Sequence, residues 1–587
     1  MQHQGLYPKS VLLAASLALI IGIFGCAQVA TADTQVSGAV GGVWGADESP
    51  FIVTGNLSLA DGDTLEIEPG VEVRFEGRFG FDVSGTLLAV GTVQDSIRFV
   101  SSSGRANDWR SIKISGRSAR NSRMQYCIIR HAYRGVEVAT SSILVENSEI
   151  SIHDNAAVRM DGSTVAIRNC VISTIGGNGV AIVGTSGASR AEVTGCHISG
   201  CGARGIGVGD NSQASLEGNY IEDIVENGID IRSAGACTVA DNVVIRGQQM
   251  GIYVELSHNC SLARNVVFRA DQEGIKIHRC ENADVINNTV YDCGGIGVFY
   301  YSSTGQLLNT LVALSGSEGV FLQASNPSLQ YNDSWGNSSD DYSGVAPDET
   351  NLSVDPLLAD PSGGDFHPQQ DSPLVDACPV PYTDPDGTLA DIGAWFYNQN
   401  IPPTIVSFSP DDLDTLKGGG LMRFSVSAVD SNLHQLFYYW YLNGVQVDGD
   451  TVYEHEFVED GNYLVRVVVD DRFYLGKSNH VWEFTVQGAA VRQDDDANRP
   501  LEFRLSDPYP NPFNSSTSVV LELARRGRVS VELFDLQGHR VGRLLDEMMN
   551  QGRYRLPVAG GSLPAGVYVI RAETGGTGVE KKLLLLK

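Results

Sequence analysis

Two series of side chains near the middle of the chain combine aromatic rings with carboxylates and cations. Within each series, successive members lie 22 or 23 residues apart. The first series is Asp230, Tyr253, Lys276, Phe299 and Phe321, and the second is Arg232, Glu255, His278, Tyr301 and Gln323. Aromatic faces pack against sugar rings, and cations bind carboxylate groups. If one surface presents both series, these residues predict a binding site for an acidic polysaccharide. The expected substrate-binding residues are Arg232, Tyr253, His278, Phe299, Tyr301, Phe321 and Gln323.

Three members of the series are also the residue types that proton abstraction requires. A calcium-dependent lyase acting on uronic-acid polymers needs clustered carboxylates to hold the ion and a basic side chain beside them. Lys276 is the candidate base, and Asp230 and Glu255 are the candidate carboxylates. The residues leave three alternatives open. The chain is a polysaccharide lyase or glycoside hydrolase, a glycan-binding protein without activity, or a surface structural or adhesion protein whose polar face is merely solvated.

A repeat running from about residue 124 to 334 sets the spacing of both series. Its landmark is Gly followed by Val or Ile, at Gly135, Gly179, Gly205, Gly228, Gly251, Gly274, Gly297 and Gly319, with Ala157 filling the one gap. Successive landmarks are 22 or 23 residues apart, except for a 26-residue step from Gly179 to Gly205. A second column of Cys and Asn residues has the same 26-residue step, from Cys170 to Cys196. Self-similarity at a fixed period of this length indicates a solenoid.

Each repeat contains three short segments of alternating polarity, for example residues 236–241, 243–246 and 251–255. Alternation rich in Val and Ile predicts strands, which would stack into three parallel sheets with rungs about 4.8 Å apart. Ile229 and Ile231 would then point inward, and Asp230 and Arg232 outward. We therefore predict an all-β fold in which residues 33–345 form a right-handed parallel β-helix with an N-terminal cap. Residues 346–400 would be a C-terminal appendage.

This repeat resembles the pectate-lyase-like superfamily of parallel β-helix proteins. The resemblance implies that a ligand would bind on the first parallel sheet, which here contains the Gly-Ile/Val strands. The Asn column fits the same fold: Asn219, Asn242, Asn265 and Asn288 would stack inside one corner, each amide bonding the neighbouring rungs. The cysteines in this column are expected to be small buried residues, whereas pairing between cysteines at the corners stays open.

A calcium loop is the second candidate site. Asp384, Asp386 and Asp391 surround the turn glycine Gly387, and oxygen ligands at alternate positions around a glycine suit that ion. The glutamate that would complete an EF-hand frame is missing. An ordinary turn stabilised by Asp side chains is the alternative, because Asp and Gly are common in turns.

Two further domains are predicted after Pro402 and Pro403. Residues 401–488 contain an aromatic strand, 437–441, followed by the turn Asn443-Gly444, and resemble an immunoglobulin-like module of the polycystic-kidney-disease (PKD) type. We expect a spacer or docking role for this domain. Residues 489–504, with three consecutive aspartates, are predicted to be a linker.

Residues 505–587 resemble the C-terminal sorting domain of the type IX secretion system. The resemblance rests on Tyr509–Asn514, Leu563–Tyr568 and the final Lys581–Lys587, in that order. It implies that the secretion machinery is a partner, and that the chain is secreted or displayed on the outer-membrane surface of a Gram-negative-type bacterium.

The N-terminus and the net charge agree with export. Residues 1–32 contain Lys9, an apolar run and then small residues, which is typical of a signal peptide. Residues 23–26 resemble a lipoprotein box, so lipidation of Cys26 is a less favoured alternative. The formal net charge of −29 argues against a nucleic-acid partner, because binding phosphates requires a basic surface.

Overall fold

The computed structural model describes residues 33–379, 381–488, 502–509, 511–513, 516–560 and 563–586. The predicted signal peptide with Cys26, and residues 489–501 of the predicted linker, lie outside the described residues. The chain divides into two compact units. The first extends to Asp384 and includes Thr388–Asn398, and the second contains Pro385–Gly387 and the chain from Gln399 onward. The predicted all-β fold is confirmed; the short 3-10 helices are η2 (Ala46–Glu48), η3 (Ser118–Asn121) and η4 (Pro361–Gly363).

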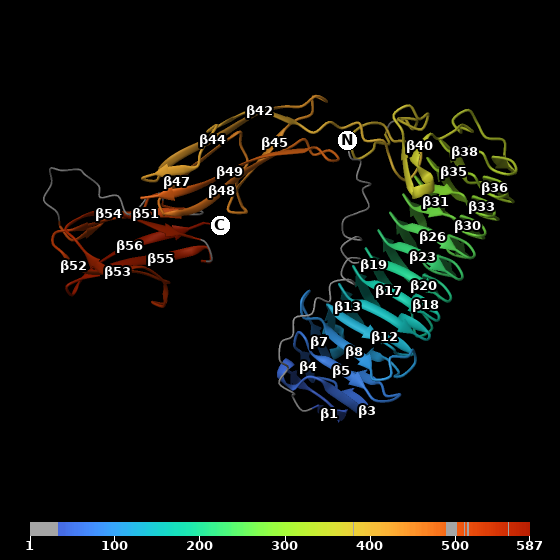
Figure 1. Cartoon of the computed structure of the whole chain (residues 1–587), viewed down its shortest axis with the longest axis horizontal. Helices are drawn as coiled ribbons and strands as arrows, with labels where there is room; N and C mark the ends of the chain where they lie inside the picture. Colours follow the sequence, from blue (N-terminus) through green and yellow to red (C-terminus); the bar gives the residue numbers. More distant parts are fainter. Residues whose placement is uncertain are drawn as a thin grey trace. The chain divides into compact units, whose positions relative to one another are not determined.

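The first unit contains a right-handed β-helix built from three parallel sheets (Figure 1). The chain visits sheet 1, sheet 2 and sheet 3 in that order on each turn, and β1 (Thr34–Ala39) and β3 (Phe51–Leu59) begin the stack. Sheet 1 contains β6 (Phe81–Val83), β9 (Ile112–Ser115), β12 (Arg134–Ala139), β15 (Ala156–Asp161), β18 (Asn178–Val183), β21 (Ile206–Gly209), β24 (Ile229–Arg232), β27 (Ile252–Glu255), β30 (Ile275–His278), β33 (Val298–Tyr301), β36 (Val320–Gln323) and β39 (Tyr342–Ser343). Sheet 2 contains β2 (Gly42–Trp44), β4 (Thr64–Ile67), β7 (Thr86–Val90), β10 (Arg123–Gln125), β13 (Ser142–Glu146), β16 (Thr164–Arg168), β19 (Arg190–Thr194), β22 (Gln213–Glu217), β25 (Cys237–Ala240), β28 (Ser261–Ala263), β31 (Ala283–Ile286), β34 (Gly305–Leu308) and β37 (Ser328–Gln330). Sheet 3 contains β5 (Glu72–Phe75), β8 (Ile97–Ser101), β11 (Cys127–Arg130), β14 (Glu149–His153), β17 (Val171–Ile175), β20 (His197–Cys201), β23 (Tyr220–Ile224), β26 (Val243–Gly247), β29 (Val266–Phe268), β32 (Thr289–Tyr291), β35 (Leu311–Ala313) and β38 (Asp333–Trp335).

The side-chain register of sheet 1 follows the repeat. Ile229, Ile252 and Ile275 pair with one another on successive rungs, and each is 0% exposed. The intervening residues Asp230, Tyr253 and Lys276 pair in the same way on the outer face. The predicted inward and outward assignment is therefore confirmed. Because side chains alternate with period two, a slip of one residue would turn the isoleucines to the outer face.

The landmark glycines are explained by crowding at the corner before each sheet 1 strand. A Cβ at Gly251 would lie 2.2 Å from Cγ1 of Val267, and one at Gly274 would lie 2.3 Å from Cγ1 of Val290. These valines belong to sheet 3 strands and point into the core. A glycine at this position lets the backbone approach the core closely enough to start the next strand.

The asparagine column forms the expected ladder. Asn219 Nδ2 donates to the Val193 carbonyl at 2.9 Å and to Asn242 Oδ1 at 2.9 Å. The backbone N–H of Asn219 also donates to Asn242 Oδ1 at 3.0 Å, and Asn242 repeats the pattern with Asn265. Each amide thus satisfies backbone groups that the corner would otherwise bury unpaired, which contributes about 0.5–1.5 kcal/mol per bond.

Nine cysteines among the described residues are buried and unpaired, at Cys127, Cys170, Cys196, Cys201, Cys237, Cys260, Cys280, Cys293 and Cys378. Burial raises the pKa of the Cys127, Cys201 and Cys293 thiols to about 12. Cys127 is therefore the small buried core residue expected for the Asn and Cys column, and the corner residues Cys201 and Cys293, whose pairing the sequence left open, are buried and unpaired as well.

The appendage covers part of the outer face of sheet 3. Its strands are β40 (Leu358–Asp360) and β41 (Asp365–Pro368), which pair antiparallel. Leu358, Phe366, Leu374 and Ile392 pack into one buried cluster with sheet 3 residues that include Phe268. This contact covers sheet 3 at its C-terminal end with an apolar layer.

The second unit contains two β-rich regions. Residues 404–487 form two sheets that share a buried core around Phe424, Trp440 and Trp482. One sheet contains β42 (Thr404–Ser409), β44 (Gly420–Val429) and β47 (Val452–Phe457), and the other contains β43 (Thr415–Lys417), β45 (Phe437–Leu442), β46 (Val445–Asp448), β48 (Gly461–Asp470) and β49 (Lys477–Gln487). The assignment of this sandwich to the immunoglobulin-like or PKD class stays a prediction.

The last region also has two sheets with a core of its own, which includes Val519, Val531 and Ile570. One sheet contains β50 (Arg504–Leu505), β51 (Ser516–Leu523) and β54 (Gly552–Ala559), and the other contains β52 (Gly527–Phe534), β53 (Arg540–Met549), β55 (Gly566–Thr574) and β56 (Thr577–Leu585). Pro510 and Asn514 of the predicted sorting motif lie outside the described residues.

Candidate functional site

Both predicted series lie on the outer face of sheet 1, and we call these ten residues the site face. Strands β24, β27, β30, β33 and β36 present them on consecutive rungs. One column pairs Asp230, Tyr253, Lys276, Phe299 and Phe321, and the other pairs Arg232, Glu255, His278, Tyr301 and Gln323. Five rungs at about 4.8 Å span roughly 20 Å, long enough for several sugar units.

Asp230 is committed to ion pairs. Its side chain is 1% exposed, and its oxygens accept from Arg232 Nε at 2.7 Å and from Asn227 Nδ2 at 2.7 Å. Arg204 Nε lies 2.9 Å from the same carboxylate. Removing one partner from such a buried group costs several kcal/mol, so Asp230 does not fit the role of a calcium ligand. Its function in the fold is to fix the Arg232 guanidinium.

Glu255, Tyr253 and His278 form a connected triplet. His278 Nδ1 lies 2.9 Å from the Tyr253 hydroxyl and 3.2 Å from Glu255 Oε1. Burial lowers the pKa of His278 below its usual value, and the Glu255 carboxylate offsets part of that effect. Burial and the Glu255 charge together raise the pKa of Tyr253. Both groups are therefore neutral at pH 7.5, the state in which an imidazole can accept a proton.

The side-chain nitrogen of Lys276 is engaged by two neighbouring side chains. Its Nζ lies 2.8 Å from Glu273 Oε1 and 5.2 Å from the centroid of the Phe299 ring. Both contacts are favourable, because a carboxylate and an aromatic face each attract a cation. Lys276 can still bind an anionic ligand as a point charge. Glu273 comes from the corner that precedes β30.

The aromatic residues differ in how much ring area they offer. Tyr253 is 6% and Phe299 is 9% exposed, because side chains on the neighbouring rungs cover them. Phe299 stacks on Phe321 with ring centroids 5.1 Å apart, and Tyr301 and Phe321 are half-buried. Gln323 is exposed at the end of the face. Tyr301 and Phe321 are therefore the rings that a ligand would reach, whereas Tyr253 and Phe299 support them.

The predicted calcium loop is divided between the two units. Asp384 and Asp391 belong to the first unit, where Asp391 accepts backbone N–H groups from Asp376 at 2.7 Å and Tyr397 at 2.6 Å. Asp384 Oδ2 accepts the Asp391 N–H at 2.8 Å, as an Asp-stabilised turn would. Asp386 belongs to the second unit and accepts the Gln399 N–H at 2.7 Å. Calcium binding by these three aspartates stays a prediction.

A different group in the second unit has metal-ligand geometry. Among the residues that the structure describes, Asp430, His434 and Asp471 form the one group of three or more candidate ligands, and their donor atoms all lie within 4.8 Å of one another. The two carboxyl side chains are 2% and 0% exposed, and Asp430 Oδ2 and His434 Nδ1 have no hydrogen-bond partner within the described part of the chain. The period-based sequence argument missed this group because it lies outside the repeat.

Comparison with known families identifies two parts of the chain. The family described as "Right handed beta helix region" matches residues 134–279, 184–316 and 251–354. This segment is a right-handed β-helix. The family described as "Secretion system C-terminal sorting domain" matches residues 508–586, so the chain ends in a sorting domain that directs secretion or cell-surface display. No helix within the described part of the chain combines the length and apolarity needed to cross a membrane.

Solved structures with a matching β-helix have low sequence identity to this chain. Pectate lyase Pel9A is 14% identical, with a TM-score of 0.34, covering 58% of this chain and 89% of its own. The mannuronan C-5 epimerase AlgE4 A-module of Azotobacter vinelandii is 13% identical, with a TM-score of 0.30, covering 52% of this chain and 83% of its own. A search of curated proteins found no match. The function of the β-helix must therefore be argued from its own residues.

Proposed function

We propose that this secreted or surface-displayed protein binds an acidic polysaccharide along the site face of its β-helix. The observation that carries the proposal is the alternation of cationic and aromatic groups on consecutive rungs. Arg232 lies over the Tyr253 ring at 4.8 Å, and Lys276 lies over the Phe299 ring at 5.2 Å. The arginine and lysine would hold carboxylate groups, while the Tyr301 and Phe321 rings would pack against sugar rings.

The cations on this face are positioned before any ligand arrives. The ion pair with Asp230 fixes Arg232, and Glu273 fixes Lys276. A side chain that is already ordered loses less conformational entropy on binding, so a given contact contributes more to affinity. Arg232 retains 43% of its side-chain exposure, which leaves the guanidinium accessible to a ligand.

A second candidate function is processing of the same polymer. The triplet of Glu255, Tyr253 and His278 favours it over a purely adhesive role. The Glu255 carboxylate can only accept hydrogen bonds and the Tyr253 hydroxyl can accept one, so a hydrogen on His278 Nδ1 suits both neighbours and leaves the Nε2 lone pair free. That atom is a candidate base for the proton next to a uronate carboxyl group. In a lyase, the released electron pair would form a double bond and expel the glycosidic oxygen.

Calcium does not enter this candidate mechanism. Asp230 is saturated by two arginines and an asparagine, and Glu255 lies beside Arg232 and His278. Arg232 and Lys276 would instead supply the positive charge that stabilises the developing carbanion. His278 replaces the predicted Lys276 as the proposed base.

Binding can be tested with the full chain and polygalacturonate by isothermal titration calorimetry. We expect the double variant Tyr301→Ala, Phe321→Ala to weaken affinity at least tenfold, because it removes the two accessible rings. The variant Tyr133→Ala removes a half-buried tyrosine elsewhere and serves as the matched control. Equal affinity of the double variant and the control would refute binding at this face.

The processing candidate needs a separate readout. Release of unsaturated oligosaccharides from polygalacturonate, alginate and other uronic-acid polymers is measured for the wild type and for His278→Gln. Activity that disappears in His278→Gln while affinity is retained supports a lyase. If the wild type binds but releases no product from any of these polymers, the protein is a glycan-binding protein.

We also propose that Asp430, His434 and Asp471 bind a divalent cation. His434 Nδ1 lies 3.8 Å from Asp430 Oδ1 and 3.9 Å from Asp471 Oδ2. These separations are too long for hydrogen bonds but match ligands that surround one ion at about 2.0–2.4 Å. One imidazole with two carboxylates suits zinc or manganese better than calcium.

Calorimetric unfolding of the full chain after EDTA treatment, with and without each added ion, tests the cation site. We expect the transition of residues 404–487 to rise by several degrees with the bound ion and to lose this response in Asp430→Asn. If the unfolding temperature of this transition changes neither with EDTA nor with added zinc, manganese or calcium, the site is excluded.

A further inference from the structure

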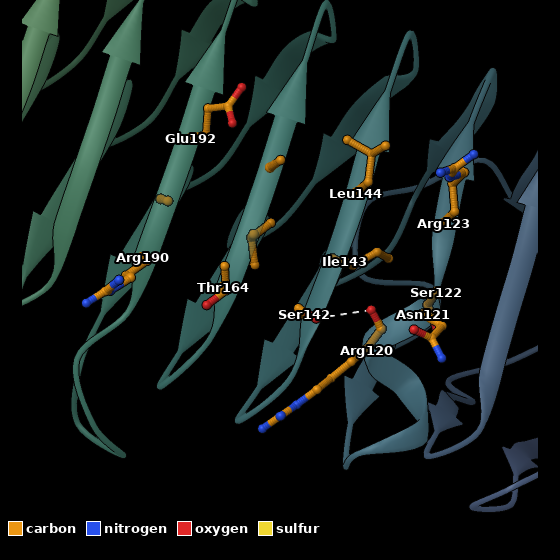
Figure 2. Close-up of a pocket in the computed structure, with 13 residues that line it drawn as sticks. Arg120, Asn121, Ser122, Arg123, Ser142, Ile143, Leu144, Thr164, Arg190 and Glu192 are labelled. Carbon is orange, nitrogen blue, oxygen red and sulfur yellow. Dashed lines mark hydrogen bonds between the residues drawn. The ribbon is translucent and has the colours of Figure 1, made fainter.

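The outer face of sheet 2 contains a groove that is separate from the site face on sheet 1. The groove has a volume of about 560 Å³ and lies over β10, β13, β16 and β19. Cavities of roughly 300–1,000 Å³ are typical of sites for small ligands. Its floor consists of short or half-buried side chains, including Ser142, Thr164 and Ala166. Figure 2 shows a row from Arg190 through Thr164 and Ser142 to Arg120 along one side of these strands.

Two irregular corners, called the walls below, flank the groove; the first contributes lining residues, whereas the second contributes none and leads into the lining residue Arg190. The corner between β9 and β10 contains η3 and occupies residues 116–122, and the corner between β18 and β19 occupies residues 184–189. The two corners between them are short, at residues 140–141 and 162–163. The second wall accounts for the 26-residue step in the repeat. Two long corners three rungs apart, with short corners between them, leave a trough about 14 Å across.

Both walls are tied to the solenoid by hydrogen bonds. In the first wall, the Ser142 hydroxyl donates to the Arg120 carbonyl at 3.1 Å and the Thr86 hydroxyl donates to the Ser118 carbonyl at 3.0 Å. In the second wall, Asp161 accepts the Ser186 N–H at 2.7 Å and the Thr185 hydroxyl. The groove is therefore a formed part of the fold.

Three arginines border the groove without a carboxylate partner. Arg120, Arg123 and Arg190 are exposed, and among the described residues none of the three has a carboxylate oxygen within the 4.0 Å of an ion pair. The acid in the lining, Glu192, is neutralised by Arg168 through bonds of 2.7 and 2.9 Å. Other arginines of the β-helix are paired, as Arg246, Arg264 and Arg269 are with Asp223, Asp241 and Asp292, whereas Arg78, Arg105, Arg110, Arg117 and Arg279 also have no ion pair among the described residues. The distinguishing feature of Arg120, Arg123 and Arg190 is that three guanidinium groups without ion pairs line one groove, in a chain whose net charge is −29.

We propose that this groove is a second binding site for anionic sugars, in which Arg120, Arg123 and Arg190 hold the carboxylate or sulfate groups of an acidic oligosaccharide. A guanidinium fork matches the two oxygens of either group. The polar floor of Ser142 and Thr164 supplies hydroxyl groups to sugar hydroxyls. The choice of an acidic saccharide over other anions rests on the proposed function. Because the groove lies on a different sheet from the site face, one chain would bind two polymer strands or two parts of one polymer.

The proposal is tested by calorimetric titration of the full chain with tetragalacturonate, a sulfated tetrasaccharide and inorganic sulfate. Wild type is expected to bind two oligosaccharides per chain. The triple variant Arg120→Gln, Arg123→Gln, Arg190→Gln should bind one, with at least a tenfold loss at the missing site. The variant Arg246→Gln, Arg264→Gln, Arg269→Gln removes the same charge from paired positions and should keep both sites.

The site-face variant Tyr301→Ala, Phe321→Ala separates this proposal from the proposed function. If it binds one oligosaccharide that the triple arginine change then removes, both proposals hold. If the site-face change abolishes all binding and the groove change has no effect, only the groove proposal fails. If the groove change abolishes all binding and the site-face change has no effect, only the proposal for the site face fails. Binding of inorganic sulfate as tightly as of either tetrasaccharide would show an anion site without sugar recognition and would overturn the groove proposal.

Discussion

The Tyr253 hydroxyl lies 2.9 Å from Nδ1 of His278, which sits one rung further along the β-helix. Parallel pairing places the two residues in adjacent columns, and Glu255 bridges them from the same rung as Tyr253. The imidazole is therefore oriented by two neighbours that the repeat itself positions. This arrangement has a measurable consequence even without a substrate.

We predict that His278 is neutral at pH 7.5 with its hydrogen on Nδ1, because Glu255 accepts that hydrogen. Nitrogen-15 NMR of the histidine ring distinguishes the two tautomers. In Glu255→Gln the side chain can also donate, so the Nε2–H form should become populated. A wild-type ring that is charged at pH 7.5, or already in the Nε2–H form, would contradict the proposed base.

The register of sheet 1 predicts the effect of a buried charge. Ile252→Asp would bury a carboxylate between Ile229 and Ile275, which costs several kcal/mol and should unfold the β-helix. Ile252→Val leaves the register intact and should cost about 0.5–1.5 kcal/mol. Circular dichroism and thermal melting compare the two variants. A soluble Ile252→Asp protein with the wild-type melting temperature would contradict the inward position.

His153 predicts a loss of stability in mild acid. Its Nδ1 accepts the Ala132 N–H at 3.1 Å, its Nε2 donates to the Ile129 carbonyl at 3.1 Å, and burial lowers the pKa of His153 to about 4. In the unfolded chain the pKa is about 6.5, so between pH 6.5 and 4 the unfolded state binds more protons. Stability should therefore be complete above pH 6.5 and fall by about 3 kcal/mol as the pH drops to 4.

Chemical denaturation of wild type and His153→Gln across this range isolates the histidine from other groups. Asp333 acts in the opposite direction, because burial raises its pKa to about 7 and its contribution weakens as the pH rises. The difference in unfolding free energy between wild type and His153→Gln should therefore change with pH even where the total stability changes little. A constant difference would contradict the burial effect.

The sorting domain predicts an export defect that leaves the β-helix intact. Deletion of residues 505–587 should trap the protein in the periplasm, and the retained chain should still resist proteolysis, because the β-helix has its own core. Deletion of residues 401–488 serves as the control and should leave export unchanged. Cell fractionation and surface labelling measure both. Normal surface display after the first deletion would exclude the sorting role.

The period of the sequence was enough to predict the solenoid, the inward isoleucines and the Asn ladder, because each depends on a residue and its equivalent one turn away. The partners within the site face were not predictable in this way. Arg204 reaches Asp230 from a corner on the preceding rung, and Glu273 reaches Lys276 from a corner on the same rung. Corner residues have no fixed period, so their contacts depend on local loop geometry.

The arginine groove illustrates the same limit. The sequence showed the 26-residue step as an interruption of the repeat. That this longer corner lies on the same edge of sheet 2 as η3 became clear only from the structure. The cluster of Asp430, His434 and Asp471 brings together two segments of a sandwich whose strands have no repeat, the loop after β44 and the end of β48. Such long-range pairings carry no local sequence signal.

Labelling of the buried thiols can report which turns of the β-helix open. Eight of the nine described free cysteines are distributed from Cys127 to Cys293 along the stack, all shielded from solvent. A membrane-permeant alkylating reagent would leave a closed solenoid unlabelled and mark each turn that opens, because reaction needs an accessible thiolate. Mass spectrometry of the labelled peptides would then show from which end the stack frays, turn by turn.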